Sequence, residues 1–211
     1  MREKIAGGGR GDPGFAFAPL TGERWADLEV LFGPRGACGG CWCMAWRLTR
    51  SEFDRGKGDG NRKAFRAIVR SGAEPGVLAY HGGEPVGWCA VAPREDYPAL
   101  GRSRVLAPVD ERPVWSISCL FVARAARRSG VSVRLIRAAV EHAAAHGGSV
   151  VEAYPVEPYS ENMPAAFAWT GTASAFRKAG FTEVLRRSRT RPIMRLEIGR
   201  WPGSPHDRKR R

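Results

Sequence analysis

The hydrophobic positions of this chain repeat with two periods, one typical of helices and one typical of strands. Four apolar residues spaced four positions apart predict an amphipathic helix over 131–146, closed by two glycines; these residues are Val131, Leu135, Ala139 and Ala143. Shorter helices are expected over 61–69, over 172–179 and after Thr21, whose side chain suits an N-cap.

Strands are expected where apolar residues run together between turn residues. The strongest run, 114–122, is apolar enough at its end for the centre of a sheet. The runs 77–80 and 86–91 flank a Gly-Gly turn and predict a hairpin. Shorter strands are expected at 15–19, 150–154, 181–184 and 192–198. This order predicts an α/β fold whose sheet is antiparallel first and parallel where the long crossover helix lies.

The composition fits a single globular domain with short tails. The chain has 211 residues, of which 43% are hydrophobic and 26% are charged. No apolar run reaches the roughly 20 residues of a membrane helix, and the first residues lack the apolar core of a signal peptide. We therefore expect a cytoplasmic protein with a disordered N-terminus at 1–13, a domain at 14–199 and a basic tail at 200–211.

The charge is unusual and unevenly distributed. The net charge is +13, and arginine supplies 29 of the 34 basic residues. Such an excess favours a polyanionic partner, namely nucleic acid, a membrane surface or a phosphate-rich cofactor. Residues 186–211 hold ten basic and two acidic residues, so most of the excess lies at the C-terminal end. No groove-reading motif or interleaved aromatic residue accompanies them, which makes nucleic acid the weaker alternative.

The residues between the central strand and the long helix have the features of an anion-binding turn. A strand end, a short turn containing Gly130 and a helix start direct several backbone N–H groups to one place, where the helix dipole adds positive charge. Arg127 and Arg128 add two full charges. An ordinary loop with solvated arginines would give the same local pattern.

A longer segment around this turn resembles a known signature. The run from Val122, V-A-R-A-A-R-R-S-G-V-S-V-R-L-I, resembles the acetyl-CoA signature of the GNAT superfamily of N-acetyltransferases, with Arg127, Gly130 and Ser132 at its three key positions. Ser132 departs from the usual Gly or Ala. The segment 176–181 resembles the family's helix ending in Gly-Phe. The resemblance covers roughly 15–198, and the loop G-C-W-C-M-A-W-R is similar to one in uncharacterised members.

The resemblance implies a mixed, mostly antiparallel sheet in which the parallel strands 114–122 and 149–154 splay apart. Acetyl-CoA, the implied co-substrate, would enter this gap, pairing its pantetheine arm with the first strand and resting its pyrophosphate on the 127–132 amides. A backbone N–H near Val122 would polarise the thioester carbonyl for direct attack by an amine. The implied cofactor-binding residues are Leu120, Phe121, Val122, Arg127, Arg128, Ser129, Gly130, Val131, Ser132 and Phe176.

The residues that transfer protons remain open. Many family members place a tyrosine, as acid toward the CoA thiolate, where this chain has Phe176, which cannot donate a proton. Tyr154 or Tyr159 is a candidate for that role, with a structural tyrosine as the alternative. Glu152 and Ser118 lie on the two strands that flank the gap, and Glu152 shares a strand face with Tyr154. Glu152 is the candidate base, directly or through water, unless it is an ion-paired strand carboxylate.

Cysteines and histidines offer further chemistry. Five cysteines, an odd number without a secretion signal, favour reduced thiols. Cys38, Cys41 and Cys43 lie in a glycine-rich loop, and three thiolates fall short of the four ligands of structural zinc, so this loop is expected to form a pocket wall or to pack. His142 and His146 have the i, i+4 spacing of metal ligands. Because no third ligand is apparent, we expect surface histidines and no metal.

The expected function is therefore N-acetyl transfer from acetyl-CoA to a primary amine of a small molecule or peptide. A GNAT-fold protein that binds CoA as a sensor, without catalysis, is the alternative that Phe176 keeps open. A basic nucleic-acid-binding module is a second alternative. The acceptor is not identified by any motif, no membrane partner is expected, and the sequence leaves open whether the chain forms a homodimer.

Overall fold

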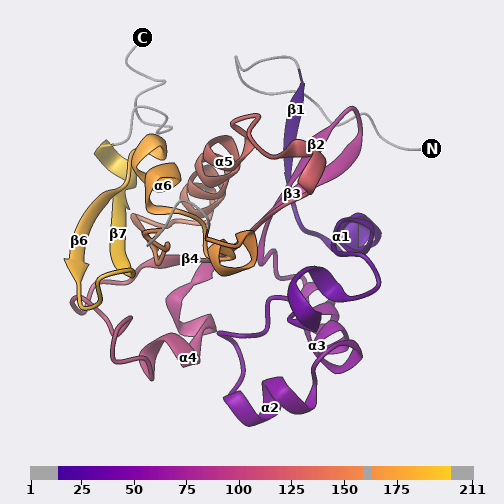
Figure 1. Cartoon of the computed structure of the whole chain (residues 1–211), viewed down its shortest axis with the longest axis horizontal. Coiled ribbons are helices and arrows are strands. Elements are labelled where there is room, and N and C mark those ends of the chain that lie inside the picture. Colours follow the sequence, from indigo (N-terminus) through magenta and orange to yellow (C-terminus); the bar gives the residue numbers. More distant parts are fainter. Residues whose placement is uncertain (1–13, 159–162, 201–211) are drawn as a thin grey trace.

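Seven strands form one sheet in the order β1-β2-β3-β4-β5-β7-β6 in the computed structural model, which describes residues 14–158 and 163–200 (Figure 1). All neighbouring strands are antiparallel except β4 and β5, which confirms the expected mixed α/β sheet. The strands are β1 Phe15–Pro19, β2 Gly76–His81, β3 Glu84–Pro93, β4 Trp115–Val122, β5 Val150–Ala153, β6 Thr182–Arg186 and β7 Pro192–Glu197.

Helices cover both faces of this sheet. The α-helices are α1 Trp25–Phe32, α2 Arg50–Arg55, α3 Asp59–Arg70, α4 Pro98–Gly101, α5 Val131–Ala145 and α6 Ala173–Ala179. Helices α5 and α6 pack on one face, and the elements between β1 and β2, together with α4, lie on the other (Figure 1). Single helical turns occupy Gly22–Arg24, Gly36–Gly40, Arg94–Asp96, Arg124–Ala126, Ala165–Ala168 and Ile198–Arg200.

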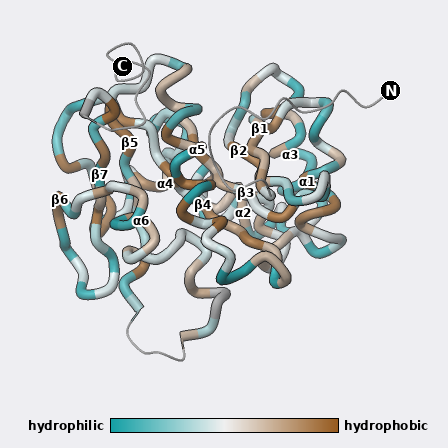
Figure 2. Tube along the Cα trace, turned by 90° about the horizontal axis from the view of Figure 1, so that it is seen from above, coloured by the Kyte–Doolittle hydropathy of each residue, from teal (hydrophilic) through white to brown (hydrophobic). Residues whose placement is uncertain are grey.

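Alternating side chains of the strands enter two separate cores. Ala79 and Cys89 point toward α5, whereas their neighbours Leu78 and Trp88 point toward α1 and α3. This alternation follows from the two-residue period of a strand, and burial on both faces explains why β2 and β3 are almost continuously apolar. Figure 2 shows the same pattern as hydrophobic segments along the strands and hydrophilic segments toward the outside.

Strands β4 and β5 pair over only three residues. The paired positions are Trp115 with Val151, Ser116 with Glu152 and Ile117 with Ala153. The register between β3 and β4 shifts at the next residue, so that Ser118 has no partner and forms a bulge. Beyond this bulge β4 continues to Val122 without β5 beside it, as the resemblance to a splayed pair predicts.

Two local expectations differ from the structure. Thr21 makes no side-chain cap, because the turn Gly22–Arg24 precedes α1 and Arg24 occupies the N-cap position. Helix α2 was not expected, since its six residues show no long apolar repeat. Its signal is the capping box of Thr49 and Glu52, which satisfies the first amides of the helix reciprocally.

Within the described ranges, none of the helices combines the length and the apolarity that crossing a bilayer requires. The expected disorder at 1–13 and the expected tail beyond Arg200 lie outside the described residues.

Candidate active site

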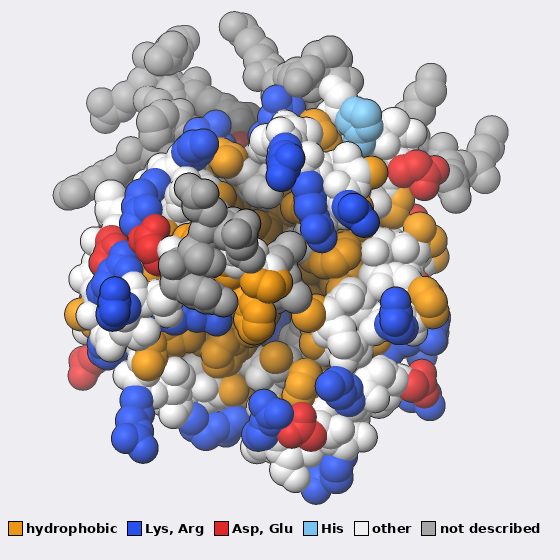
Figure 3. Space-filling model, in the orientation of Figure 1, with side chains coloured by type: hydrophobic (Ala, Val, Ile, Leu, Met, Phe, Trp, Pro, Cys, Tyr) orange, Lys and Arg blue, Asp and Glu red, His pale blue; other side chains and the backbone are white. Residues whose placement is uncertain are grey.

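A cavity of about 710 Å³ lies where β4 and β5 part. One wall is β4 from the Ser118 bulge to Val122, and the opposite walls are the cysteine loop and the segment 168–175. Arg127 and Ser132 line its end near α5. Figure 3 shows hydrophobic side chains gathered around the middle of this face, with Lys and Arg side chains around them. The cavity therefore runs from an apolar pocket to a basic helix start.

The turn before α5 presents backbone amides at this basic end. Arg128 and Gly130 both have positive φ, at 66° and 80°, a combination that turns successive N–H groups to one side. The Arg134 N–H makes a long bond of 3.5 Å to the Gly130 carbonyl, so the amides of 131–133 are the free first amides of the helix. Arg127 Nε donates to the Val122 carbonyl at 3.2 Å, which holds this side chain at the strand end.

The predicted cofactor-binding residues divide into three groups. Leu120, Phe121, Val122, Arg127 and Ser132 line the cavity. Arg128, Ser129 and Gly130 are exposed on the turn beside it. Val131 and Phe176 are buried in the core and do not line the cavity. Phe176 packs edge-on against Phe181 with ring centroids 5.1 Å apart, so it fills the core where a tyrosine acid is usual in the family.

The free edge of β4 carries the amides that the resemblance assigns to pantetheine. The Leu120 N–H donates to the Trp169 carbonyl at 2.7 Å, so the segment after β5 occupies this amide. Amides two residues apart on a strand point to the same side. The Val122 N–H therefore leaves β4 on the same side as the Leu120 N–H, toward the cavity that Val122 lines. The Val122 amide is thus placed for an oxyanion-type contact.

A tyrosine that the sequence analysis did not single out lies behind the bulge. Tyr97 is buried beside Ser118, which lines the cavity. Burial raises the pKa of Tyr97 to about 12, outweighing the opposite effects of Arg47 and Ser118. The Arg47 guanidinium stacks 4.6 Å from the Tyr97 ring. Tyr97 lies in a polar stretch without hydrophobic periodicity, so the sequence pattern gave no signal for it. The fold brings it to the bulge.

The cysteine loop forms part of the cavity wall. Cys38, Cys41 and Cys43 all line the cavity as free thiols. Burial raises the pKa of Cys41 to about 11, so this thiol is protonated at neutral pH and is a poor nucleophile. Trp88 Nε1 donates to the Cys43 sulfur at 3.0 Å, which fixes the loop to β3.

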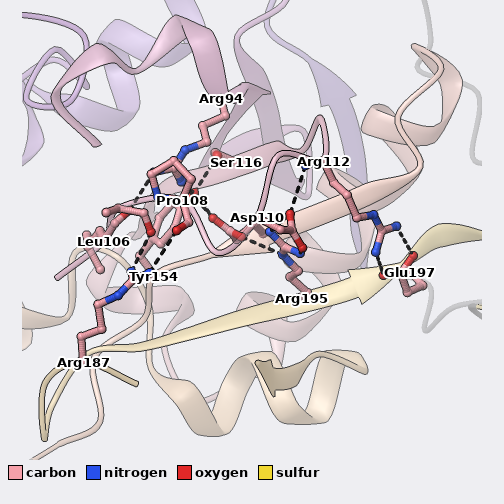
Figure 4. A network of polar contacts seen from close by, with 12 residues as sticks. Arg94, Leu106, Pro108, Asp110, Arg112, Ser116, Tyr154, Arg187, Arg195 and Glu197 are labelled. Carbon is pink, nitrogen blue, oxygen red and sulfur yellow. Dashed lines mark hydrogen bonds and ion pairs between the residues drawn. The ribbon is translucent and has the colours of Figure 1, made fainter. Parts of the chain in front are cut away.

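Glu152 and Tyr154 lie in a buried polar network on the sheet face opposite α5. Figure 4 shows Tyr154 of this network with Arg94, Ser116 and Arg195. The Glu152 carboxylate accepts from Arg94 at 2.9 Å, from Arg195 at 2.7 Å and from the Tyr154 hydroxyl at 2.7 Å. The Tyr154 hydroxyl also contacts Ser116 at 2.8 Å. Neither Glu152 nor Tyr154 lines the cavity. Their catalytic roles remain predictions, and these contacts favour a structural role.

Several arginines in the described part of the basic C-terminal segment are engaged within the chain. Arg186 pairs with Glu183 and Glu157, and Arg195 pairs with Asp110 as well as with Glu152. Arg187 donates to backbone carbonyls of the 105–108 segment. These arginines therefore have structural partners, which weakens the argument for a nucleic-acid surface. Tyr159, the other candidate acid, lies outside the described residues.

The family model described as the acetyltransferase (GNAT) family matches residues 42–169. The chain belongs to this family. The signature around Arg127 and Gly130, the parted strands and the cavity between them are thus those of a GNAT acetyltransferase, and acetyl-CoA is the co-substrate. The residues present fit this molecule: a helix start with free amides and Arg127 suits a pyrophosphate, and the Val122 amide on the edge of β4 that faces the cavity suits a carbonyl of pantetheine.

Solved structures share this fold at low sequence identity. A putative GNAT acetyltransferase from Desulfovibrio desulfuricans is 17% identical and one from Streptococcus pneumoniae is 12% identical. A third structure, the NatC complex bound to Gag peptide and CoA, is 13% identical. Each comparison has a TM-score of 0.50 and covers 87% of this chain and 98% of the other. No curated protein sequence matches the chain.

We predict that Glu152→Gln destabilises the protein by about 3–5 kcal/mol, because it removes the carboxylate paired with the largely buried Arg94 and leaves Arg195 with Asp110 alone. The measurement is urea unfolding followed by circular dichroism. Glu183→Gln, which removes a carboxylate from the more exposed pairs with Arg186 and Arg177, is the matched control and should change stability far less. Equal stability of Glu152→Gln and wild type would contradict the structural role.

Proposed function

We propose that the protein transfers the acetyl group of acetyl-CoA to a primary amine that binds in the 710 Å³ cavity. The observation that supports this most is the continuity of the cavity, which joins the Arg127–Ser132 turn, the free edge of β4 and the apolar cysteine loop. Donor and acceptor could then meet at the Ser118 bulge. We place the reaction in the cytoplasm, where the five free cysteines stay reduced.

The proposed reaction is a direct transfer. The amine nitrogen attacks the thioester carbonyl carbon, the C–N bond forms and the C–S bond breaks, which releases the CoA thiolate. The Val122 N–H stabilises the negative charge that develops on the carbonyl oxygen. The attacking nitrogen loses one proton to water, and the thiolate gains one, so the products are an amide and CoA. The protonated Cys41 thiol takes no part as a nucleophile.

We assign the proton for the thiolate to the Ser118 hydroxyl, which passes its proton on and regains one from the water that accepts the amine proton, with Tyr97 as the positioning residue behind it. Ser118 is the bulge residue of β4 and lines the cavity, and Tyr97 lies beside it away from solvent. In this proposal Ser118 and Tyr97 supply the proton-donor function that Phe176, which has no hydroxyl, cannot supply. Glu152 and Tyr154 are the competing pair, and they would need a route from the buried network to the cavity.

The acceptor is best described as an amine on an apolar, aromatic body. Among the described residues that line the cavity there is no carboxylate, and the two charged ones are Arg50 and Arg127. A polycation would have no opposite charge to bind there. Trp46 and Trp169 stack with ring centroids 5.8 Å apart in the cavity wall, which suits a flat hydrophobic group.

The first prediction of this proposal concerns the choice of the acceptor amine. With acetyl-CoA, 2-phenylethylamine should release free CoA thiol faster than spermidine or kanamycin, because the cavity is apolar and carries no acidic group among its described residues. Thiol release is followed with a chromogenic disulfide. Arg127→Ala should raise the KM for acetyl-CoA. Arg137→Ala is the control and should leave this KM unchanged, because Arg137 lies midway along α5 and bonds the Lys178 carbonyl. Preference for spermidine would contradict the proposed acceptor class.

The second prediction concerns the proton donor. Ser118→Ala should lower kcat by about a hundredfold, the lower end of the range for a lost general acid, while the KM for acetyl-CoA changes little. Tyr97→Phe should lower kcat less and shift its pH profile. Ser71→Ala is the control, because Ser71 is an exposed serine away from the cavity whose hydroxyl bonds the Ile68 carbonyl. An unchanged kcat in Ser118→Ala would remove Ser118 from the mechanism.

A sensor that binds acetyl-CoA without catalysis is the second candidate. It is favoured by the absence of any carboxylate or imidazole from the described cavity lining, and by Phe176 in the core. The same assays separate the two functions. Thermal stabilisation by acetyl-CoA without thiol release by any amine would support the sensor, and absence of stabilisation would contradict both.

A further inference from the structure

Two histidines and one carboxylate meet at the C-terminal end of α5. His142 lies in the last turn of α5, His146 is its C-cap, and Glu74 comes from the turn between α3 and β2. Their ligand atoms all lie within 4.8 Å of one another, and no other such group of three occurs among the described residues. The cluster is about 20 Å along the helix from the Arg127–Ser132 turn, so it is separate from the acetyl-CoA site.

Backbone contacts leave one nitrogen of each imidazole facing the carboxylate. His142 Nε2 contacts the Glu74 carbonyl at 3.1 Å, and His146 Nδ1 contacts the His142 carbonyl at 2.8 Å. Each of these nitrogens must carry a proton to donate to a carbonyl. The opposite nitrogens, His142 Nδ1 and His146 Nε2, are then lone-pair donors. A ring N–H held by a backbone carbonyl is the usual outer contact of a metal-binding histidine.

The spacing of the three atoms suits a shared ion. Glu74 Oε2 lies 3.5 Å from His146 Nε2 and 3.9 Å from His142 Nδ1. Two ligands that bind one tetrahedral zinc ion at about 2.0–2.1 Å lie about 3.4 Å apart. The two distances from Glu74 Oε2 to the histidine nitrogens are therefore only slightly longer than this ligand–ligand separation, whereas they are long for hydrogen bonds.

The surroundings fit a partly open site. The Trp115 ring packs against both imidazoles, with centroid distances of 6.0 Å to His142 and 5.7 Å to His146. The side chain of His142 is 7% exposed, contrary to the expectation of two surface histidines, and that of His146 is 42% exposed. One side of the cluster is thus fixed by packing, and the other is open to a water ligand.

We propose that Glu74, His142 and His146 bind a divalent transition-metal ion, with zinc as the first candidate. Two imidazoles and a carboxylate suit zinc and its neighbours in the first row, whereas calcium and magnesium prefer oxygen ligands alone. The bound ion would tie the turn before β2 to the end of α5. The sequence showed only the i, i+4 pair, because Glu74 lies 68 positions before His142 and reaches it through the fold.

The test uses the full chain, stripped with a chelator, desalted and titrated with zinc chloride in a calorimeter. We expect one equivalent to bind and the Tm to rise. Glu74→Gln and His146→Ala should each weaken zinc binding by about tenfold or more. His81→Ala, which removes an exposed histidine outside the cluster, is the matched control and should leave the affinity unchanged.

Cobalt distinguishes this site from the cysteine loop. Cobalt bound by imidazole and carboxylate shows visible absorption without a thiolate charge-transfer band, and Cys41→Ser should leave this spectrum unchanged. Several outcomes would overturn the proposal: no binding or Tm shift with zinc, affinity unaffected by Glu74→Gln and His146→Ala, or a thiolate band that Cys41→Ser removes. In the first of these, the cluster serves only to pack the end of α5 against the turn before β2.

Discussion

The separation of β4 from β5 after three paired residues determines where the chemistry of this protein can occur. In a continuous sheet the backbone groups of β4 would be satisfied by the next strand. Here the Ser118 bulge ends that pairing, and the amides beyond it face a cavity and the Trp169 carbonyl. The same strand then leads into the turn before α5. One strand therefore positions both the reactive end and the pyrophosphate end of the donor site.

The buried network around Glu152 holds the paired end of these strands together. Glu152 on β5 accepts from Arg195 on β7 and from Arg94 beyond β3, so one carboxylate connects three parts of the chain. A carboxylate buried among two guanidinium groups stabilises this junction as long as every partner remains. The strands can thus part at a fixed residue. In the proposed mechanism Ser118 takes the acid role that the sequence suggested for Tyr154, and water, not Glu152, accepts the proton of the amine.

Local patterns were sufficient to predict the sheet, the long helix and the turn that precedes it, because each depends on residues close together in the sequence. Contacts between distant segments were not predictable in this way. The strand period correctly placed Glu152 and Tyr154 on one face, but it could not show that Arg94 and Arg195 cover that face. Tyr97 behind the bulge and Glu74 beside two histidines likewise depend on the folded chain.

Hydrogen exchange measured with and without CoA tests most directly whether the parted strands form the donor site. The structure predicts that CoA slows exchange in two segments, the β4 edge at 118–122 and the helix start at 127–133, and leaves β6 and α3, which do not line the cavity, unchanged. Protection confined to other parts of the chain, or none at saturating CoA, would contradict the proposed donor site.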